Sequence, residues 1–208
     1  MSRRTPTQPR AQATRRSILD ATMSLMERNE PEAITTGMVA DAAGVPVGSV
    51  YRYFRDRGDI FRALCQELMD RVDEPLEALL RRDEPVEALI EETLELLVAT
   101  SSEADLRLVR VLKTSPELAE IEMKSNQRVG EILAGALGAR NPALKPVERR
   151  AGATVLMRAV LSFVEPIMAE ADPAMRDAVH REAVRMAGVY ARLLTEEGRA
   201  GLRSHGSD

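Results

Sequence analysis

One stretch, residues 35–54, limits what this chain can fold into more than any other part of the sequence. Thr35 is a good helix N-cap, because its hydroxyl can accept hydrogen bonds from the free amides of a first helical turn. Gly44 stands where that helix would end, since glycine takes the left-handed conformation without a Cβ clash. Pro46 suits the first turn of a second helix, which would reach Phe54. The stretch therefore predicts a helix, a sharp turn and a short helix.

The second helix is only about two turns long. It must pack on its neighbours, and Val50 and Phe54 are the pair expected to do so. Its outward residues are slim at the N-terminal end and rich in donors after it: Val47, Gly48, Ser49, Tyr51, Arg52 and Tyr53. A recognition helix in the major groove of DNA needs a slim end for the base edges and donors for the phosphates. The alternative is a structural hairpin in an all-α core, because this geometry also occurs in proteins that bind no nucleic acid.

A run of fixed residues at fixed offsets resembles the DNA-binding signature of the TetR family of bacterial transcriptional regulators: Val39-Ala40-x-x-Ala43-Gly44-Val45-x-x-Gly48-Ser49-x-Tyr51-x-Tyr53-Phe54, followed by Arg57 and Ile60. The run covers about the first quarter of the chain. The rest resembles the family only in its helical character and length. Two positions depart from the pattern. Pro46 replaces the usual serine or threonine, which removes a hydroxyl, and Gly58 replaces a helix-favouring residue.

The resemblance implies a homodimeric regulator that binds a double-stranded DNA operator. The residues that it assigns to DNA contact are Thr35, Thr36, Val47, Gly48, Ser49, Tyr51, Arg52, Tyr53 and Arg57. For Arg57, the alternative to a phosphate contact is an exposed ion pair with Asp59. The first interpretation is a repressor released from DNA by a small apolar or amphipathic effector. The alternatives are an activator, a constitutive DNA-binding protein, and a helical binding or scaffold protein without a DNA function.

Composition favours helices over sheets, because alanine, leucine, glutamate and arginine dominate the 208 residues and tryptophan is absent. The single cysteine, Cys65, rules out an internal disulfide and fits a reducing compartment. No apolar run approaches the ~20 residues of a membrane span, and the N-terminus lacks an apolar secretory core. The expectation is a soluble cytoplasmic protein with no membrane partner.

Charge gives weak support for DNA binding. The whole chain has a formal net charge of −4, whereas DNA-binding domains are often strongly basic. Residues 1–60 hold nine arginines and no lysine against seven acidic residues, which leaves this part at +2. Five of the nine are arginines at 3, 4, 10, 15 and 16, ahead of or inside the first helix. Since phosphate neutralisation supplies nonspecific affinity, we expect weak binding away from the operator.

The predicted fold is all-α, with an N-terminal three-helix helix-turn-helix domain and a larger helical domain for ligand binding and dimerisation. The expected division is a disordered arm over 1–12, the DNA-binding domain over 13–57, the larger domain over 58–197 and a flexible tail over 198–208. The arm is expected either to contact the minor groove or phosphates, or only to solubilise the chain.

Helical periodicity predicts a series of further elements. They are a first helix over 13–28, a fourth over 56–72, short helices over 75–80 and 103–112, a helix opening at Pro85, and a long helix from Pro116 that frays toward Gly135 and Gly138. A loop over 139–145 and two final helices follow. No repeat and no strand pattern is present in the sequence.

The two final helices are predicted to form the dimer interface. Residues 152–164 are apolar almost all the way round, so this helix must be covered on several sides. The last helix, about 173–196, carries one apolar stripe. Two such helices from each chain would make an isologous four-helix bundle, through Val155, Val160, Val164, Val179, Ala183, Met186, Ala187, Tyr190 and Leu194. The alternative is burial of these residues within one chain.

An effector pocket is expected among the middle helices. Its candidate lining is Met69, Leu94, Val98, Leu108, Val111, Met123, Met157, Arg158, Leu161 and Phe163, and methionine suits such a site because it adapts to irregular apolar shapes. Arg158 could meet an anionic ligand, but it could also pair with a carboxylate or reach water. His180 and His205 have no partner at metal-ligand spacing, and no catalytic motif is present. The sequence predicts no catalytic residue, metal or cofactor.

Overall fold

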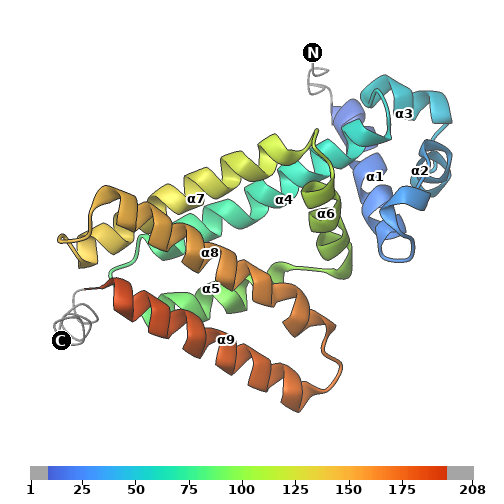
Figure 1. The fold of residues 1–208 in the computed structure, drawn as a ribbon. Helices are drawn as coiled ribbons and strands as arrows, with labels where there is room; N and C mark the ends of the chain where they lie inside the picture. Colours follow the sequence, from blue (N-terminus) through green and yellow to red (C-terminus); the bar gives the residue numbers. More distant parts are fainter. Residues whose placement is uncertain (1–8, 196–208) are drawn as a thin grey trace. The chain divides into compact units, whose positions relative to one another are not determined.

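The computed structural model describes residues 9–195, and every regular element in that range is a helix (Figure 1). The elements are α1 (Pro9–Met26), the 3-10 helix η1 (Pro31–Ala33), α2 (Thr36–Ala43), α3 (Val47–Tyr53), α4 (Arg57–Leu80), α5 (Val86–Thr100), α6 (Glu103–Thr114), α7 (Ala119–Arg140), α8 (Pro146–Ala169) and α9 (Pro173–Leu194). The all-α prediction is confirmed.

The helices group into two compact units. Unit 1 holds the described residues up to 70 together with Ser101–Met123, and unit 2 holds Arg71–Thr100 together with the described residues from 124. The predicted boundary between 57 and 58 does not match this grouping, because α6 packs on α1 and η1. Arg107 of α6 donates from Nη1 to the carbonyl oxygen of Asn29 at 3.0 Å. Composition along the chain cannot predict a contact between residues 78 positions apart, and so it cannot place this domain boundary.

Unit 1 forms around the helix-turn-helix. Ile18 and Leu19 of α1 and Val39 of α2 are fully buried, and α1 packs on α2, which packs on α3. Val50 and Phe54 are buried as predicted. Burial of a Leu, Ile or Phe side chain stabilises a fold by about 1.5–3 kcal/mol, so these contacts hold a short helix that could not form alone.

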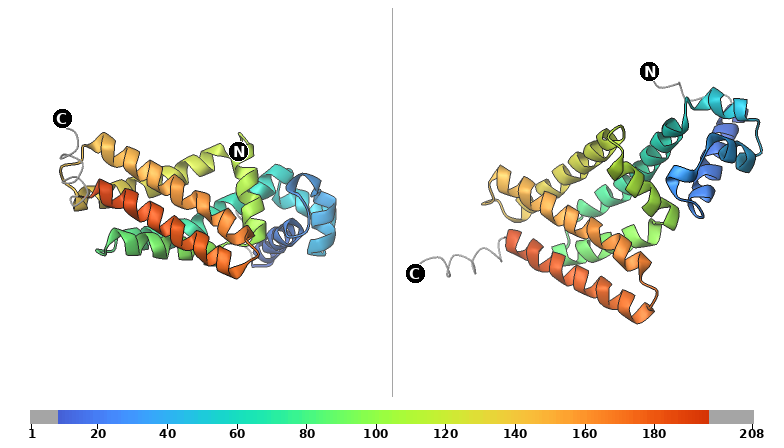
Figure 2. Two further views of the ribbon diagram at one scale, coloured as in Figure 1. Left: turned by 60° about the horizontal axis from the view of Figure 1, so that its bottom comes forward. Right: turned by 45° about the vertical axis from the view of Figure 1, so that its right-hand side comes forward.

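Unit 2 is a layered helical body in which α8 and α9 run side by side in both views (Figure 2). α5 packs against both of them. Small residues on α9, namely Ala183, Ala187 and Ala191, are buried and allow this close approach. At the C-terminal end of α9, the buried Asn141 donates from Nδ2 to the carbonyl oxygen of Leu194 at 3.1 Å.

Several helix ends differ from the sequence prediction. α1 begins at Pro9, so residues 9–12 of the expected arm are helical, whereas 1–8 and the expected tail over 198–208 lie outside the described residues. α4 continues through Pro75, where a new helix was predicted. Proline removes one hydrogen bond from a helix, but Leu76 and Leu79 beyond it are buried, and their packing keeps the helix continuous.

The two ends of α7 also differ from prediction. α7 begins at Ala119, after a turn at residues 115–118. It then runs unbroken to Arg140 and does not fray at the glycines. Leu133 and Leu137 of this last part are buried, so packing offsets the loss of helix propensity at glycine.

α8 corrects the expectation that no segment could span a membrane. By length and apolar composition alone, α8 is the one helix in the range 9–195 that could do so. A core helix of a soluble protein has the same composition, and α8 packs on α5 and α9. Only 33% of its most apolar window is buried among the described residues, and the apolar side chains of Val155 and Leu161 on this helix are exposed.

Candidate nucleic-acid interface

The first helix of the predicted motif has the expected ends. Thr35 is the N-cap of α2, with its hydroxyl accepting from the amide of Met38 at 3.2 Å. Gly44 follows α2 at φ 65°, ψ 33°, the left-handed conformation. Pro46 is the N-cap of α3 and lies just outside the helix where its first turn was predicted. The Thr35 hydroxyl therefore caps α2 as predicted, and because Thr35 is exposed its contact with DNA stays a prediction.

The outward face of α3 carries the residues that the sequence assigns to DNA. Val47 and Tyr51 are 48% and 47% exposed. Gly48 and Arg52 are also exposed, while Ser49 and Tyr53 are half-buried. On the opposite side, Val50 is fully buried. The helix therefore presents a slim N-terminal end and two phenols at the surface, which is the arrangement a groove-reading helix needs.

Two hydrogen bonds fix polar groups on this surface. The hydroxyls of Thr36 and Tyr51 lie 2.9 Å apart and share a hydrogen bond that joins α2 to α3. Arg52 donates from Nη2 to the hydroxyl of Tyr53 at 2.9 Å, and its guanidinium carbon lies 5.0 Å from the centre of the Tyr53 ring. These groups are exposed and already oriented, so little side-chain entropy would be lost on contact with a phosphate.

Arg57 differs from the prediction. Its Nη1 faces the backbone of unit 1 and donates to the carbonyl oxygens of Pro31 at 3.3 Å, Glu32 at 2.7 Å and Ile34 at 3.2 Å. The guanidinium carbon lies 5.7 Å from the centre of the Phe61 ring. The alternative pair with Asp59 is also absent, because Asp59 pairs with Arg55 and Arg62.

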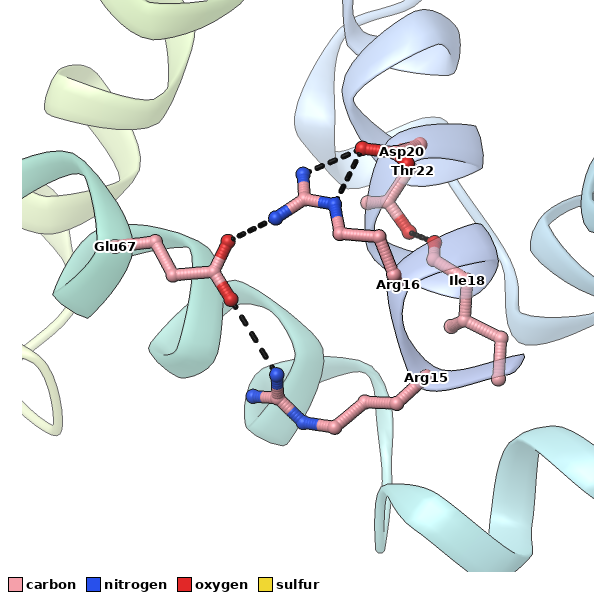
Figure 3. Close-up of polar contacts among 6 residues, drawn as sticks. All are labelled: Arg15, Arg16, Ile18, Asp20, Thr22 and Glu67. Carbon is pink, nitrogen blue, oxygen red and sulfur yellow. Dashed lines mark hydrogen bonds and ion pairs between the residues drawn. The ribbon is translucent and has the colours of Figure 1, made fainter. Parts of the chain in front are cut away.

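Arg15 and Arg16 of α1 are paired within unit 1 (Figure 3). Glu67 of α4 accepts from Arg15 at 3.4 Å and from Arg16 at 2.6 Å. Arg16 also donates from Nε to Asp20 at 2.7 Å. The hydrogen bonds to Asp20 and then Glu67 raise the pKa of Arg16 above its ordinary value. These two charges were counted toward phosphate neutralisation, but in the structure they join α1 to α4.

The predicted dimer residues divide into three sets by their exposure. Val160, Val164, Ala183 and Ala187 are buried within the chain, which is the alternative weighed from the sequence. Val179, Tyr190 and Leu194 are half-buried, whereas Val155 and Met186 are 52% and 50% exposed. Part of the predicted α9 stripe, Ala183 and Ala187, is thus buried within the chain, and the contact of the remaining residues with a second copy stays a prediction.

The residues that stay exposed on these helices form an apolar surface. It includes Val155 and Leu161 of α8 and Met186, Val189 and Leu193 of α9, each between 40% and 52% exposed, while Val147 and Met175, near the first turns of the two helices, are exposed as well. On α9, Met186, Val189 and Leu193 are spaced three and four positions apart, so they share one face. We call Val155, Leu161, Met186, Val189 and Leu193 together the α8–α9 apolar face.

The predicted pocket residues are divided between the two units. Met69, Leu108, Val111 and Met123 belong to unit 1, and the other six, Leu94, Val98, Met157, Arg158, Leu161 and Phe163, belong to unit 2. Met123, Arg158 and Leu161 are exposed, so they do not line an enclosed cavity of their own unit. Leu94, Leu108 and Met157 are buried, as core residues also are.

One buried polar group of unit 2, the hydroxyl of Thr93, is not among the site residues predicted from the sequence. Thr93 of α5 is 8% exposed, and its hydroxyl is buried without a hydrogen-bond partner. Buried helical threonines usually bond to the carbonyl four residues back, as Thr22 does to Ile18 at 2.8 Å. No sequence signal separates the two threonines, because they differ only in whether the folded chain gives the hydroxyl a hydrogen-bond partner.

The groups that could carry other chemistry are few. Over residues 9–195, no three His, Cys, Asp or Glu side chains are grouped so that they could hold a metal ion. Cys65 is fully buried, and burial raises the pKa of its thiol to about 12. The thiol therefore stays protonated and unreactive at neutral pH.

A capped helix, a left-handed glycine turn and a short exposed helix on a three-helix core define a helix-turn-helix protein with a second helical body. The profile of the bacterial regulatory proteins of the tetR family matches residues 18–64. The profile described as tetracyclin repressor-like, C-terminal domain, matches residues 85–190, just over half of the chain. The chain belongs to the TetR family of bacterial regulatory proteins.

Individual relatives agree with this assignment. The chain is 28% identical over 145 residues to the HTH-type transcriptional regulator AcrR of Shigella flexneri, an alignment that covers 69% of this chain and 63% of the relative. It is 39% identical over 79 residues to the repressor LfrR of Mycolicibacterium smegmatis, covering 33% and 41%. Both alignments thus span less than two thirds of the relatives' own lengths.

Solved structures share the fold. The regulator FadR from Bacillus subtilis, solved in complex with stearoyl-CoA, matches with a TM-score of 0.60 at 18% identity, covering 88% of this chain and 98% of that one.

Proposed function

We propose that this protein is a homodimeric, sequence-specific DNA-binding repressor that a small apolar or amphipathic ligand releases from its operator. The observation that carries the proposal is the exposed face of α3, where Tyr51 is 47% exposed and its hydroxyl is held by Thr36 at 2.9 Å. Such a regulator works on the chromosome, so the proposed location is the cytoplasm, and its action includes no catalytic step.

In this proposal α3 enters the major groove. Val47, Gly48 and Ser49 approach base edges, because their side chains are short and lie at the helix N-terminus. Tyr51 and Tyr53 donate to phosphates on either side. Two copies of α3 in successive major grooves would stand ~34–36 Å apart or somewhat wider.

A second copy of this chain is the proposed cover of the α8–α9 apolar face. Contiguous exposed apolar surface is uncommon on monomers and marks an interaction site. An isologous contact places the same face of two copies together, so α8 and α9 from each chain would form a four-helix bundle.

The proposed effector is apolar or amphipathic. Support comes from FadR of Bacillus subtilis, whose structure holds stearoyl-CoA. In this chain the unpartnered hydroxyl of Thr93 offers a polar anchor inside an apolar unit. Coupling between effector and operator is typically worth ~1–3 kcal/mol, a 5–150-fold change in affinity. The ligand must bind the dimer more tightly at one separation of the two α3 helices than at another; otherwise the operator affinity does not change.

The direct test selects a duplex from a randomised pool with the purified protein and then measures binding by gel shift and mass by sedimentation. We expect one selected sequence with two half-sites and a dimer at micromolar concentration. Failure to enrich any sequence would contradict DNA recognition. Loss of transcription from the selected site when the gene is deleted would identify an activator instead.

Removing the hydroxyl of Tyr51 should weaken DNA binding without changing the fold. We expect Tyr51→Phe to lower operator affinity about tenfold, because a hydrogen bond to a charged group contributes about 1.5–3 kcal/mol. The slope of log affinity against log salt should stay constant, since no charge is removed. Tyr190→Phe, the same change on α9, is the control and should bind as the wild type does. Equal operator affinities of the two variants would show that the Tyr51 hydroxyl does not contact DNA.

Replacing Thr93 with valine should stabilise the protein. A buried hydroxyl without a partner costs about 1–3 kcal/mol, and valine keeps the shape without that group. Thr22→Val is the matched control, because Thr22 is equally buried but bonded to Ile18, so this change should lower the free energy of unfolding. Denaturant unfolding measures both. A loss of stability in Thr93→Val would mean that water or another group already satisfies the hydroxyl.

A further inference from the structure

We propose that Arg57 is a positioning residue that fixes the turn between α1 and α2, and through it the DNA-reading surface; this inference rests on the proposed function. Arg57 opens α4, and its Nη1 lies within 3.3 Å of the carbonyl oxygens of Pro31, Glu32 and Ile34. A single guanidinium nitrogen thus contacts three backbone carbonyls within residues 31–34, which lie 23–26 positions away along the chain.

Of these carbonyls, that of Pro31 already accepts from the amide of Ile34, whereas those of Glu32 and Ile34 lie past the hydrogen bonds of η1. η1 spans only Pro31–Ala33, and its own hydrogen bonds run from Ala33 to Glu30 at 3.0 Å and from Ile34 to Pro31 at 3.3 Å. The last carbonyls of a helix carry partial negative charge and lack an internal partner. A cation at this end satisfies both requirements, and Arg57 provides it.

The aromatic ring of Phe61 packs against the guanidinium of Arg57. Phe61, one turn later on α4, is 4% exposed, and its ring centre lies 5.7 Å from the guanidinium carbon. A planar guanidinium stacks on an aromatic face while its fork of donors points outward in fixed directions. Lysine keeps the charge but has neither the plane nor the fork. The site is therefore built for arginine geometry and not for positive charge alone.

The turn leads directly to the DNA-reading surface. Ile34 is fully buried, and the next residue, Thr35, caps α2. Thr36 follows, with its hydroxyl bonded to that of Tyr51 on α3. If the carbonyl of Ile34 loses its donor, we expect the backbone next to it to become more mobile, and with it the Thr35 cap and the Thr36–Tyr51 hydrogen bond. Arg57 thus acts on DNA recognition through the backbone of residues 31–36.

The experiment compares Arg57→Lys with wild type in the full-length protein. We expect faster amide hydrogen exchange at Ala33 and Ile34 and about tenfold weaker binding to the duplex selected from a randomised pool. The salt slope should not change, because the charge is kept. Arg55→Lys is the matched control: Arg55 lies two positions earlier, its side chain is 52% exposed, and it should behave as wild type in both measurements.

The opposite role, a direct phosphate contact, gives a different pattern. In that case Arg57→Lys would keep wild-type affinity and exchange, and Arg57→Gln would lower the magnitude of the salt slope by ~0.9 with unchanged exchange; either result overturns the proposal. Arg57→Gln also replaces the lysine variant if that variant does not fold. A wild-type protein that selects no duplex would refute the proposed function, while the exchange comparison would still decide whether Arg57 holds the turn.

Discussion

Replacing Met186 with glutamate is expected to convert the dimer into monomers and, as a result, to abolish operator binding. Met186 is 50% exposed on the α8–α9 apolar face. In an isologous dimer each copy contributes the same face, so the variant would bury two carboxylates with no partner supplied. An uncompensated buried charge costs about 3–5 kcal/mol, which raises the dissociation constant of the dimer by more than about 100-fold.

The control for this change is the same substitution at another exposed methionine. Met123 is 60% exposed on α7 and lies outside the α8–α9 apolar face. Met123→Glu should leave the sedimentation profile dimeric and the gel shift intact. The two variants have equal charge, so a difference between them reports location and not general electrostatics.

Two results would contradict the dimer assignment. A dimer that persists in Met186→Glu at micromolar concentration would place the interface elsewhere. Monomers in both variants would point to a nonspecific effect of the added charge. Circular dichroism of each variant should match wild type, because both positions are exposed and tolerate a polar side chain within one chain.

Gly48→Leu is expected to weaken DNA binding strongly while the protein stays folded. Gly48 lies in the first turn of α3, and a Cβ added there meets no atom within 4 Å. Leucine also has better helix propensity than glycine by roughly 0.8–1 kcal/mol, so the melting temperature should hold or rise. In the proposed complex the same side chain stands between α3 and the base edges. Overpacking typically costs about 1–3 kcal/mol, which corresponds to about 5- to 150-fold weaker binding.

Gly44→Leu gives the opposite result and is the matched comparison. A Cβ at Gly44 also meets nothing within 4 Å, but the backbone is at φ +65°. Left-handed backbone costs an ordinary L-residue roughly 1–2 kcal/mol, so this variant should unfold more easily. The melting temperatures of the two variants should therefore differ, and a gel shift at low temperature measures DNA binding by the folded protein in each case. Retained operator affinity in Gly48→Leu would show that α3 does not enter a groove with its N-terminal end.

Local signals were sufficient for the helix-turn-helix. Thr35, Gly44 and Val50 each follow from the chemistry of a single position: a hydroxyl that caps, a backbone without Cβ and an apolar side chain at helical spacing. The structure confirms all three. Pro75 is the counterexample, because its local preference predicts a break that the packing of neighbouring leucines prevents.

The partners of charged side chains could not be predicted in this way. Arg15 and Arg16 find Glu67 at separations of 52 and 51 residues. Arg57 finds carbonyl oxygens whose sequence context says nothing about arginine. A long flexible cation can meet an anion, a carbonyl or a phosphate with similar local preference, and its choice depends on which groups the fold brings within about 3 Å.

The sequence by itself determined the helical class, the motif and the residues that face outward on α3, because these depend on contacts within a few positions. Only the tertiary structure decided which apolar residues of α8 and α9 are left uncovered and what each arginine binds. Those outcomes depend on distances between segments far apart in the chain, and periodicity along one helix contains no information about such distances.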